Sequence, residues 1–286
     1  YGLPAPLVEA VRRDSYTREG QISVTELISP PQKAFLERVH DEEIEIDVSG
    51  QVYALLGSSV HAMLERASVD NAFQEERLKI RAGGWMVTGK PDLFDSDGVL
   101  SDFKVVSVYS FLLNEKSDWH AQLNVYRVLY EAHGFRVNRL QIIAILRDWT
   151  KRRTIEPDYP PAPALVKTIP LWPYERAVAY IKSRVEMHKK ARETGEFPEC
   201  TAEERWQRND AWAVKQRGNK RAIRVFDNED SAQLLVDASK IKSEKLEIEF
   251  RPGKSTRCQD GYCAAAPFCE QAKRLLRAEE VEEEFA

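Results

Sequence analysis

The sequence predicts an α/β protein whose central mixed β-sheet is flanked by helices. The first observation is the order of periodic segments: a helix, three strands, a helix and a strand between residues 57 and 147. The second is the turn residues between the strands, Gly83-Gly84 and Asp95 to Gly98. The third is that apolar runs are strand-sized, such as residues 142–146, whereas a bilayer span needs roughly 18 residues. We therefore expect a soluble protein.

The N-terminal elements follow from capping and periodicity. Ser23 with Glu26 three residues later predicts a helix start, and the prolines at 30 and 31 separate it from a second short helix over 32–39. Residues 57–69 form a predicted helix whose apolar face carries Val60, Met63, Leu64 and Ala67. Strands are expected over 78–81, 85–94 and 99–106.

The second half continues the pattern. A helix over 119–133 ends at Gly134, and strands follow over 139–147 and 164–171. A long helix over 173–194 begins at a proline and has Gly195 just past its end. The proline-rich stretch 157–163 is the best candidate for a break. We expect a helical segment over 1–56, a core over 57–160 and a completing segment over 161–286, all in one compact unit.

Charge excludes a globally basic nucleic-acid coat protein. The 286 residues carry 42 basic and 46 acidic side chains, for a net charge of −4. Residues 205–224 nevertheless hold seven basic residues against one acid, and the tail from 279 to 284 is acidic. Such asymmetry is typical of a polyanion-binding face, although an ordinary solvated helix face explains it too.

The two strands joined by the Asp-Gly turn carry two aspartates and a lysine. Asp102 and Lys104 lie two apart on one strand and therefore share a face, and a hairpin places Asp92 across from them. A divalent cation such as Mg²⁺ or Mn²⁺ would relieve the repulsion between the two carboxylates. The alternative is a surface salt bridge, which the apolar neighbours of Asp102 disfavour because a buried charge needs a partner.

Two helices carry further polar residues. His61 lies on the helix before the hairpin, where a lone histidine is more often structural. Gln122 and Tyr126 are separated by four residues on the helix after it and share one face. Taken alone, that pair indicates packing at the edge of the core.

Together these motifs resemble a known family. Gly57-x3-His61, Pro91-Asp92, Asp102-x-Lys104 and Gln122-x3-Tyr126, in this order, are similar to the RecB-like exonuclease branch of the PD-(D/E)xK nuclease superfamily. The resemblance covers residues 20–150 and implies a restriction-endonuclease-like core over 57–160.

The resemblance also implies roles. His61, Asp92, Asp102 and the backbone carbonyl of Phe103 would bind Mn²⁺ or Mg²⁺, and Lys104 would orient the attacking water. Gln122 and Tyr126 would hold Lys104 or the phosphate. An imidazole ligand favours Mn²⁺ over Mg²⁺. Glu76 is a further acidic candidate beside the site.

The four cysteines form a second constellation. Cys258, Cys263 and Cys269 cluster near the C-terminus, and Cys200 stands alone upstream. Disulfides are disfavoured without a secretion signal, and we expect a cytoplasmic protein of a bacterial or phage-infected cell. A structural zinc site stays open. The pattern resembles iron–sulfur forms of RecB-like nucleases, such as CRISPR-associated and AddB-type domains, and implies a [4Fe–4S] cluster that staples a helical C-terminal part, although here the first cysteine follows the core motifs.

The basic segment after Cys200 interleaves aromatic and cationic residues, which can stack bases and contact phosphates. We predict that it is a loop that binds DNA through Trp206, Trp212, Lys215, Arg217, Lys220, Arg221 and Arg224.

The leading interpretation is a metal-dependent DNA exonuclease that acts on a free DNA end, single- or double-stranded, in phage or bacterial recombination, repair or end processing. An endonuclease of the same superfamily and a metal-stapled, non-catalytic DNA-binding module are the alternatives. An iron–sulfur oxidoreductase is disfavoured because the sequence has no Gly-x-Gly-x-x-Gly fingerprint.

Overall fold

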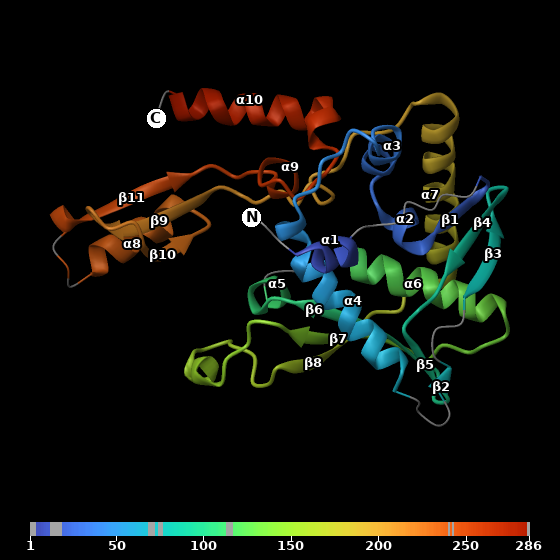
Figure 1. Cartoon of the computed structure of the whole chain (residues 1–286). Coiled ribbons are helices and arrows are strands. Elements are labelled where there is room, and N and C mark those ends of the chain that lie inside the picture. Colours follow the sequence, from blue (N-terminus) through green and yellow to red (C-terminus); the bar gives the residue numbers. More distant parts are fainter. Residues whose placement is uncertain are drawn as a thin grey trace. The chain divides into compact units, whose positions relative to one another are not determined.

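The structure is a computed structural model that describes residues 4–11, 19–67, 72–73, 77–112, 117–239, 241 and 243–284. The chain forms two compact units, of which unit 1 comprises Tyr1–Ala34 and Glu45–Phe197 and unit 2 comprises Phe35–Ile44 and Pro198–Ala286. In this division residues 161–197 belong to unit 1 together with residues 57–160, and the proline-rich stretch 157–163 lies inside that unit. Figure 1 labels the elements of both units.

Unit 1 contains two sheets rather than the single central sheet that we expected. The smaller sheet has the strand order β1-β4-β3 and the larger has the order β2-β5-β6-β7-β8. In the larger sheet, β6 and β7 are parallel and the other neighbours are antiparallel. The strands are β1 Gln21–Ser23, β2 Ala72–Phe73, β3 Leu78–Ala82, β4 Trp85–Gly89, β5 Leu93–Asp95, β6 Val99–Val106, β7 Arg139–Leu146 and β8 Ala164–Ile169.

The predicted strand over 85–94 is interrupted. Its first part is β4 in the smaller sheet, its last part is β5 in the larger sheet, and residues 90–92 lie between them. Pro91 has no N–H to donate to a ladder, so the chain leaves one sheet there and enters the other. The turn that follows matches the prediction, because the Asp95 carboxylate accepts the backbone N–H groups of Asp97 and Val99 at 3.0 and 2.8 Å.

The helices of unit 1 cover these sheets. They are α1 Ala5–Val11, α2 Val24–Ile28, α4 Val52–Glu65, α5 Val108–Leu112, α6 Ser117–Ala132 and α7 Tyr174–Thr194, with single turns η1 Val48–Gln51 and η2 Lys151–Ile155 and the first residues of α3 Pro31–Val39. Helix α6 connects the parallel strands β6 and β7, and its side chains Leu123, Val125 and Leu129 are fully buried in the core. Ser23 caps α2 by accepting the N–H of Glu26 at 3.1 Å, as predicted.

Helix α4 differs from its prediction. It begins five residues before Gly57, ends at Glu65 and buries none of its residues, and Met63 is 70% exposed. Its 3.6-residue apolar period therefore does not mark a core face. No helix in the described ranges is both long enough and apolar enough to cross a membrane.

A row of basic residues on α7 fixes the end of α2. His188 Nε2 lies 3.2 and 3.1 Å from the carbonyl oxygens of Leu27 and Ser29, and Arg184 donates to the same two oxygens. Leu27 lies in the last turn of α2 and Ser29 is its C-cap, so these carbonyls would otherwise lack partners. His188 is 2% exposed, and its burial, with the nearby Arg184 charge, lowers its pKa to about 4.

This histidine should make unfolding pH-dependent. Because the unfolded imidazole has a pKa near 6.5 and the folded one about 4, the unfolded chain binds the proton first as the pH falls. Its stabilising contribution is complete above pH 6.5 and is lost between pH 6.5 and 4, amounting to about 2 kcal/mol by pH 5. We expect urea unfolding at pH 7, 6 and 5 to show this loss in the wild type and not in His188→Gln, whose amide can still donate to the carbonyls. Equal pH dependence in both proteins would contradict the assignment.

Unit 2 contains a three-stranded antiparallel sheet of order β10-β9-β11. Its strands are β9 Ala211–Gln216, β10 Ala222–Phe226 and β11 Leu246–Arg251, and its helices are the rest of α3, α8 Glu229–Ala238, α9 Thr256–Gln259 and α10 Glu270–Glu284, with single turns η3 Ser243–Lys245 and η4 Ala266–Phe268. The segment 205–224, predicted as a basic loop, is thus largely a β-hairpin. The strands and helices of the two units confirm the expected mixture of α and β structure. The C-terminal part, however, is not wholly helical, because it contains the sheet of β9, β10 and β11.

Candidate active site

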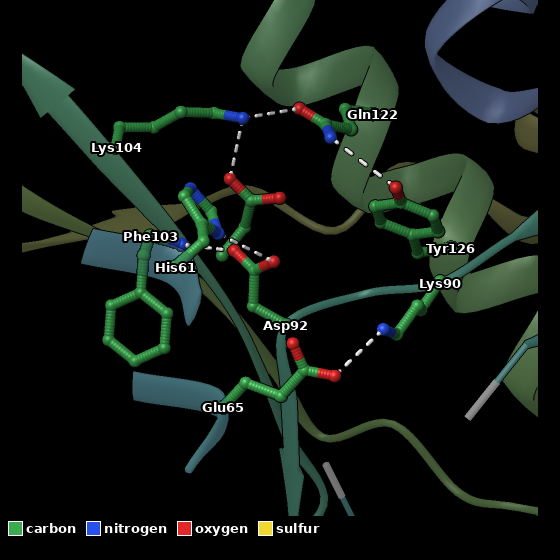
Figure 2. A network of polar contacts seen from close by, with 9 residues as sticks. His61, Glu65, Lys90, Asp92, Phe103, Lys104, Gln122 and Tyr126 are labelled. Carbon is green, nitrogen blue, oxygen red and sulfur yellow. Dashed lines mark hydrogen bonds and ion pairs between the residues drawn. The ribbon is translucent and has the colours of Figure 1, made fainter. Parts of the chain in front are cut away.

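Three elements of unit 1 bring the predicted catalytic residues together. His61 comes from α4, Asp92 from the break between β4 and β5, and Asp102 and Lys104 from β6. The antiparallel pairing of Leu93 with Ser101 brings Asp92, just before β5, next to the segment of β6 that carries Asp102. Figure 2 shows His61 and Asp92 pointing toward each other and the Lys104 ammonium pointing toward Gln122.

Asp92 is the link between α4 and β6. Its Oδ1 lies 3.1 Å from His61 Nδ1, and its Oδ2 accepts the backbone N–H of Phe103 at 2.7 Å. The hydrogen bond to Asp92 raises the pKa of His61. The break at Pro91 frees Asp92 from any ladder, so its carboxylate can turn to both partners.

Asp102 is the most deeply buried charge of the group, with 3% of its surface exposed. Burial raises the pKa of its carboxyl to about 6, while the Lys104 ammonium acts in the opposite direction. Its Oδ2 lies 2.7 Å from Lys104 Nζ as an ion pair but has no partner with hydrogen-bond geometry. A buried carboxylate oxygen without a complete partner set favours a cation.

Lys104 is held from a second side. Its ammonium donates to Gln122 Oε1 at 2.9 Å, and Gln122 Nε2 lies 3.5 Å from the Tyr126 hydroxyl (Figure 2). Burial raises the pKa of Tyr126, so the phenol stays protonated at neutral pH. Gly89 makes room for this ring, since a Cβ there would lie 2.6 Å from Tyr126 Cε1. The four-residue spacing of Gln122 and Tyr126 correctly predicted their shared face.

The donor set suits a hard divalent cation. Two carboxylates and an imidazole are ligand types that Mg²⁺ and Mn²⁺ accept, and the buried Asp102 Oδ2, which has an ion pair with Lys104 but no hydrogen bond, can accept such an ion as well. The side chains here are bonded to one another, and no group of three or more His, Cys, Asp or Glu residues in the described part of the chain stands in metal-holding positions. The role of the Phe103 carbonyl stays a prediction.

One further ion pair lies beside the site and was missed from the sequence. Lys90 Nζ donates to Glu65 Oε1 at 3.1 Å, next to Asp92 (Figure 2). Glu65 is one helical turn after His61, and this i, i+4 spacing is the signal that could have revealed it. Glu76, the acidic candidate from the sequence, lies outside the described residues.

The four cysteines all belong to unit 2. Burial raises the pKa of the Cys200 thiol to about 12, with smaller contributions from Glu204 and then from the other three cysteines. Burial likewise raises the pKa of Cys258, with Cys263 and Cys269 contributing. The stapling metal cluster that we expected is not shown in the described part of the chain.

The same region has local anchors around two of the thiols. The Gln271 side chain bonds both the N–H and the carbonyl of Cys200, at 3.0 and 2.9 Å, and so ties it to α10. Cys269 Sγ accepts the N–H of Ala272 at 3.4 Å in the first turn of that helix. These contacts hold both ends of the cysteine set independently of a metal.

The residues predicted to bind DNA do not form a continuous aromatic and cationic surface. Lys215 is ion-paired with Glu247 at 3.2 Å and with Glu249, so its charge is neutralised. Trp212 points to the opposite face of β9 and packs against Phe250 at 5.2 Å. Trp206 is exposed beneath Arg257, and Arg217, Lys220, Arg221 and Arg224 remain exposed around the hairpin. Their role in DNA binding stays a prediction.

Comparisons with known proteins yield structural likenesses. No protein-family model and no curated protein matches the sequence. The crystal structure of SSO0001 is similar with a TM-score of 0.45 and 20% identity, covering 63% of this chain and 83% of that one. An alkaline exonuclease, LHK-Exo from Laribacter hongkongensis, is similar with a TM-score of 0.40 and 10% identity, covering 62% of this chain and 90% of that one. Because both sequence identities and both TM-scores are low, these likenesses do not establish a function for this protein.

Proposed function

We propose that this protein is a divalent-metal-dependent deoxyribonuclease that hydrolyses phosphodiester bonds as an exonuclease on DNA with a free end. The observation that supports the proposal is the convergence of His61, Asp92 and Asp102 with the ammonium of Lys104. A module that only binds DNA has no need to bury Asp102 beside Asp92, because two carboxylates repel phosphate. Bacterial or phage recombination, repair or end processing is the context in which such an activity is expected.

Each residue has a defined task in this proposal. His61, Asp92, Asp102 and the Phe103 carbonyl would hold Mn²⁺ or Mg²⁺, which supplies Lewis acidity toward the phosphate and an acidified water. Lys104, held by Asp102 and Gln122 at 2.7 and 2.9 Å, keeps one N–H to orient the nucleophilic water or a phosphate oxygen. Tyr126 fixes Gln122 and thereby the direction of the ammonium.

Digestion of matched DNA substrates tests the activity and its mode. Purified protein with Mn²⁺ should shorten end-labelled linear duplex and single-stranded DNA while leaving covalently closed circles intact. Cleavage of circles would show that the protein is an endonuclease of similar chemistry, because a closed circle has no free end. Absence of cleavage on every substrate, despite DNA binding, would favour the non-catalytic module.

The choice of metal gives a sharper prediction. Because one ligand is an imidazole, we expect faster cleavage with Mn²⁺ than with Mg²⁺ at equal concentration. Ca²⁺ should bind and compete without supporting turnover, since it accepts looser coordination and is a poorer Lewis acid. Initial rates in each metal, and in Mn²⁺ with added Ca²⁺, measure both effects. Equal rates with Ca²⁺ and Mn²⁺ would contradict the assigned ligand set.

We also propose that Cys200, Cys258, Cys263 and Cys269 ligate one [4Fe–4S] cluster. The placement of all four cysteines in unit 2, with Cys200 tied to α10 by Gln271 and Cys269 bonded to the first turn of α10, supports this proposal. Four thiolates are the usual ligand set of such clusters. The cluster would have a structural role, because phosphodiester hydrolysis involves no electron transfer.

A further inference from the structure

Helix α4 carries His61 into the candidate active site without burying any of its own residues. Three of its apolar side chains, Val52, Leu56 and Met63, are 41%, 42% and 70% exposed. A helix in a packed core is held in place by interdigitated side chains, and α4 has little of this support. The place of the His61 imidazole therefore depends strongly on the polar contacts of the helix.

Two polar contacts join α4 to the segment between β4 and β5. His61 Nδ1 lies 3.1 Å from Asp92 Oδ1, and Lys90 Nζ donates to Glu65 Oε1, also at 3.1 Å. Figure 2 shows the Lys90 ammonium turned toward Glu65 and the Asp92 carboxylate turned toward His61. Because the later residue of the helix meets the earlier residue of the segment, the two run in opposite directions where they touch.

The spacings on the two sides of this junction match. His61 and Glu65 lie four residues apart on one helical face, which is a rise of about 6 Å. Lys90 and Asp92 lie two residues apart, which is about 6.6 Å in an extended chain. Pro91 stiffens this segment, because its ring fixes its own φ and favours an extended backbone at the preceding residue. Both contacts can therefore form at once, and together they oppose rotation and sliding of α4.

The Glu65–Lys90 ion pair is too exposed to contribute much to global stability. The two side chains are 48% and 35% exposed, and exposed ion pairs add little to the free energy of unfolding. An effect on geometry can be much larger, because a misplacement of about 1 Å can cost about 10²-fold in rate. By its charge alone, the Lys90 ammonium would repel a divalent cation near Asp92. Charge and position therefore predict opposite effects of removing Lys90.

We propose that Glu65 and Lys90 are positioning residues of the active site. Their ion pair, together with the contact between His61 and Asp92, clamps α4 against residues 90–92 and keeps the imidazole in place to bind the cation. Neither Glu65 nor Lys90 touches the reacting atoms, because both act through His61. The inference rests on the proposed metal-dependent function and adds two residues that lie outside the motifs recognised in the sequence.

The affinity for Mn²⁺, measured by calorimetry without DNA, tests this clamp. Glu65→Gln and Lys90→Met should each weaken Mn²⁺ binding about tenfold, as loss of a residue that orients a metal ligand commonly does. The reversed pair Glu65→Lys, Lys90→Glu should restore binding to nearly the wild-type level, because it restores the contact. Glu196→Gln is the matched control and should bind Mn²⁺ as the wild type does, since it breaks only the exposed 2.8 Å pair with Lys190 in unit 1.

A His61→Ala background shows whether the clamp acts through the imidazole. There Glu65→Gln should have no further effect on Mn²⁺ affinity, since the ligand that it positions is gone. In the cleavage assay, Glu65→Gln should raise the Mn²⁺ concentration that gives half the maximal rate and leave the rate at saturating Mn²⁺ close to that of the wild type.

The outcomes separate the clamp from the function on which it rests. Unchanged or tighter Mn²⁺ binding by Lys90→Met, or an equal loss from Glu65→Gln with and without His61, overturns the clamp while the nuclease stands. A wild type that neither binds Mn²⁺ nor cleaves DNA overturns the proposed function and this inference with it.

Discussion

Asp102→Asn and Lys104→Met should each reduce phosphodiester cleavage by about 10³-fold or more. Asn keeps the volume of Asp102 but removes the buried negative charge that a divalent cation requires. Met keeps most of the length of Lys104 but removes the ammonium, and loss of one oriented donor in a transition state typically costs 10²- to 10³-fold. Initial rates on end-labelled linear DNA with saturating Mn²⁺ measure both effects.

Matched controls separate chemistry from folding. Asp97 is exposed in the turn before β6 and Lys79 is an exposed residue of β3, and the variants Asp97→Asn and Lys79→Met should both cleave as the wild type does. Without metal, Asp102→Asn should bind DNA at least as tightly as the wild type, because a negative charge facing phosphate is gone. Wild-type cleavage by either catalytic variant, purified and folded, would disprove the assigned site.

Cys263→Ser should have the largest effect on stability. Anaerobically purified wild type is expected to absorb broadly at about 400 nm, and the variant should lose this band with its iron. Closing the loop of roughly 60 residues between Cys200 and Cys258 contributes on the order of 4 kcal/mol in the chain-entropy model developed for disulfides. Denaturation of the variant should therefore begin at markedly lower urea concentration.

The neighbouring Ala264→Ser is the matched control, since it introduces the same hydroxyl into the same turn without removing a thiol. It should keep both the absorbance and the stability of the wild type. Residual cleavage should remain easier to detect in Cys263→Ser than in Asp102→Asn, because His61, Asp92 and Asp102 stay intact. One zinc per chain without iron or acid-labile sulfide would replace the proposed cluster with a structural zinc site.

Local chemistry in the sequence determined much of the framework. The two-residue period of a strand correctly placed Asp102 and Lys104 on one face, where their charges meet at 2.7 Å. Helical spacing did the same for Gln122 and Tyr126. Pro173 and Gly195 bounded α7 to within a residue, because a fixed φ favours a helix start and a left-handed φ, 72° at Gly195, favours its end.

Only the tertiary structure decided how these pieces meet. The apolar period of α4 could not reveal that its face is exposed, because periodicity records amphipathicity and not what lies opposite. The neutralisation of Lys215 depends on Glu247 and Glu249, some thirty residues later, through the register of β9 and β11. Likewise, only the structure shows that the break at Pro91 separates two strands that belong to different sheets. Local propensity acts over a few residues, whereas such contacts depend on the path of the whole chain, which packing of the complete core selects.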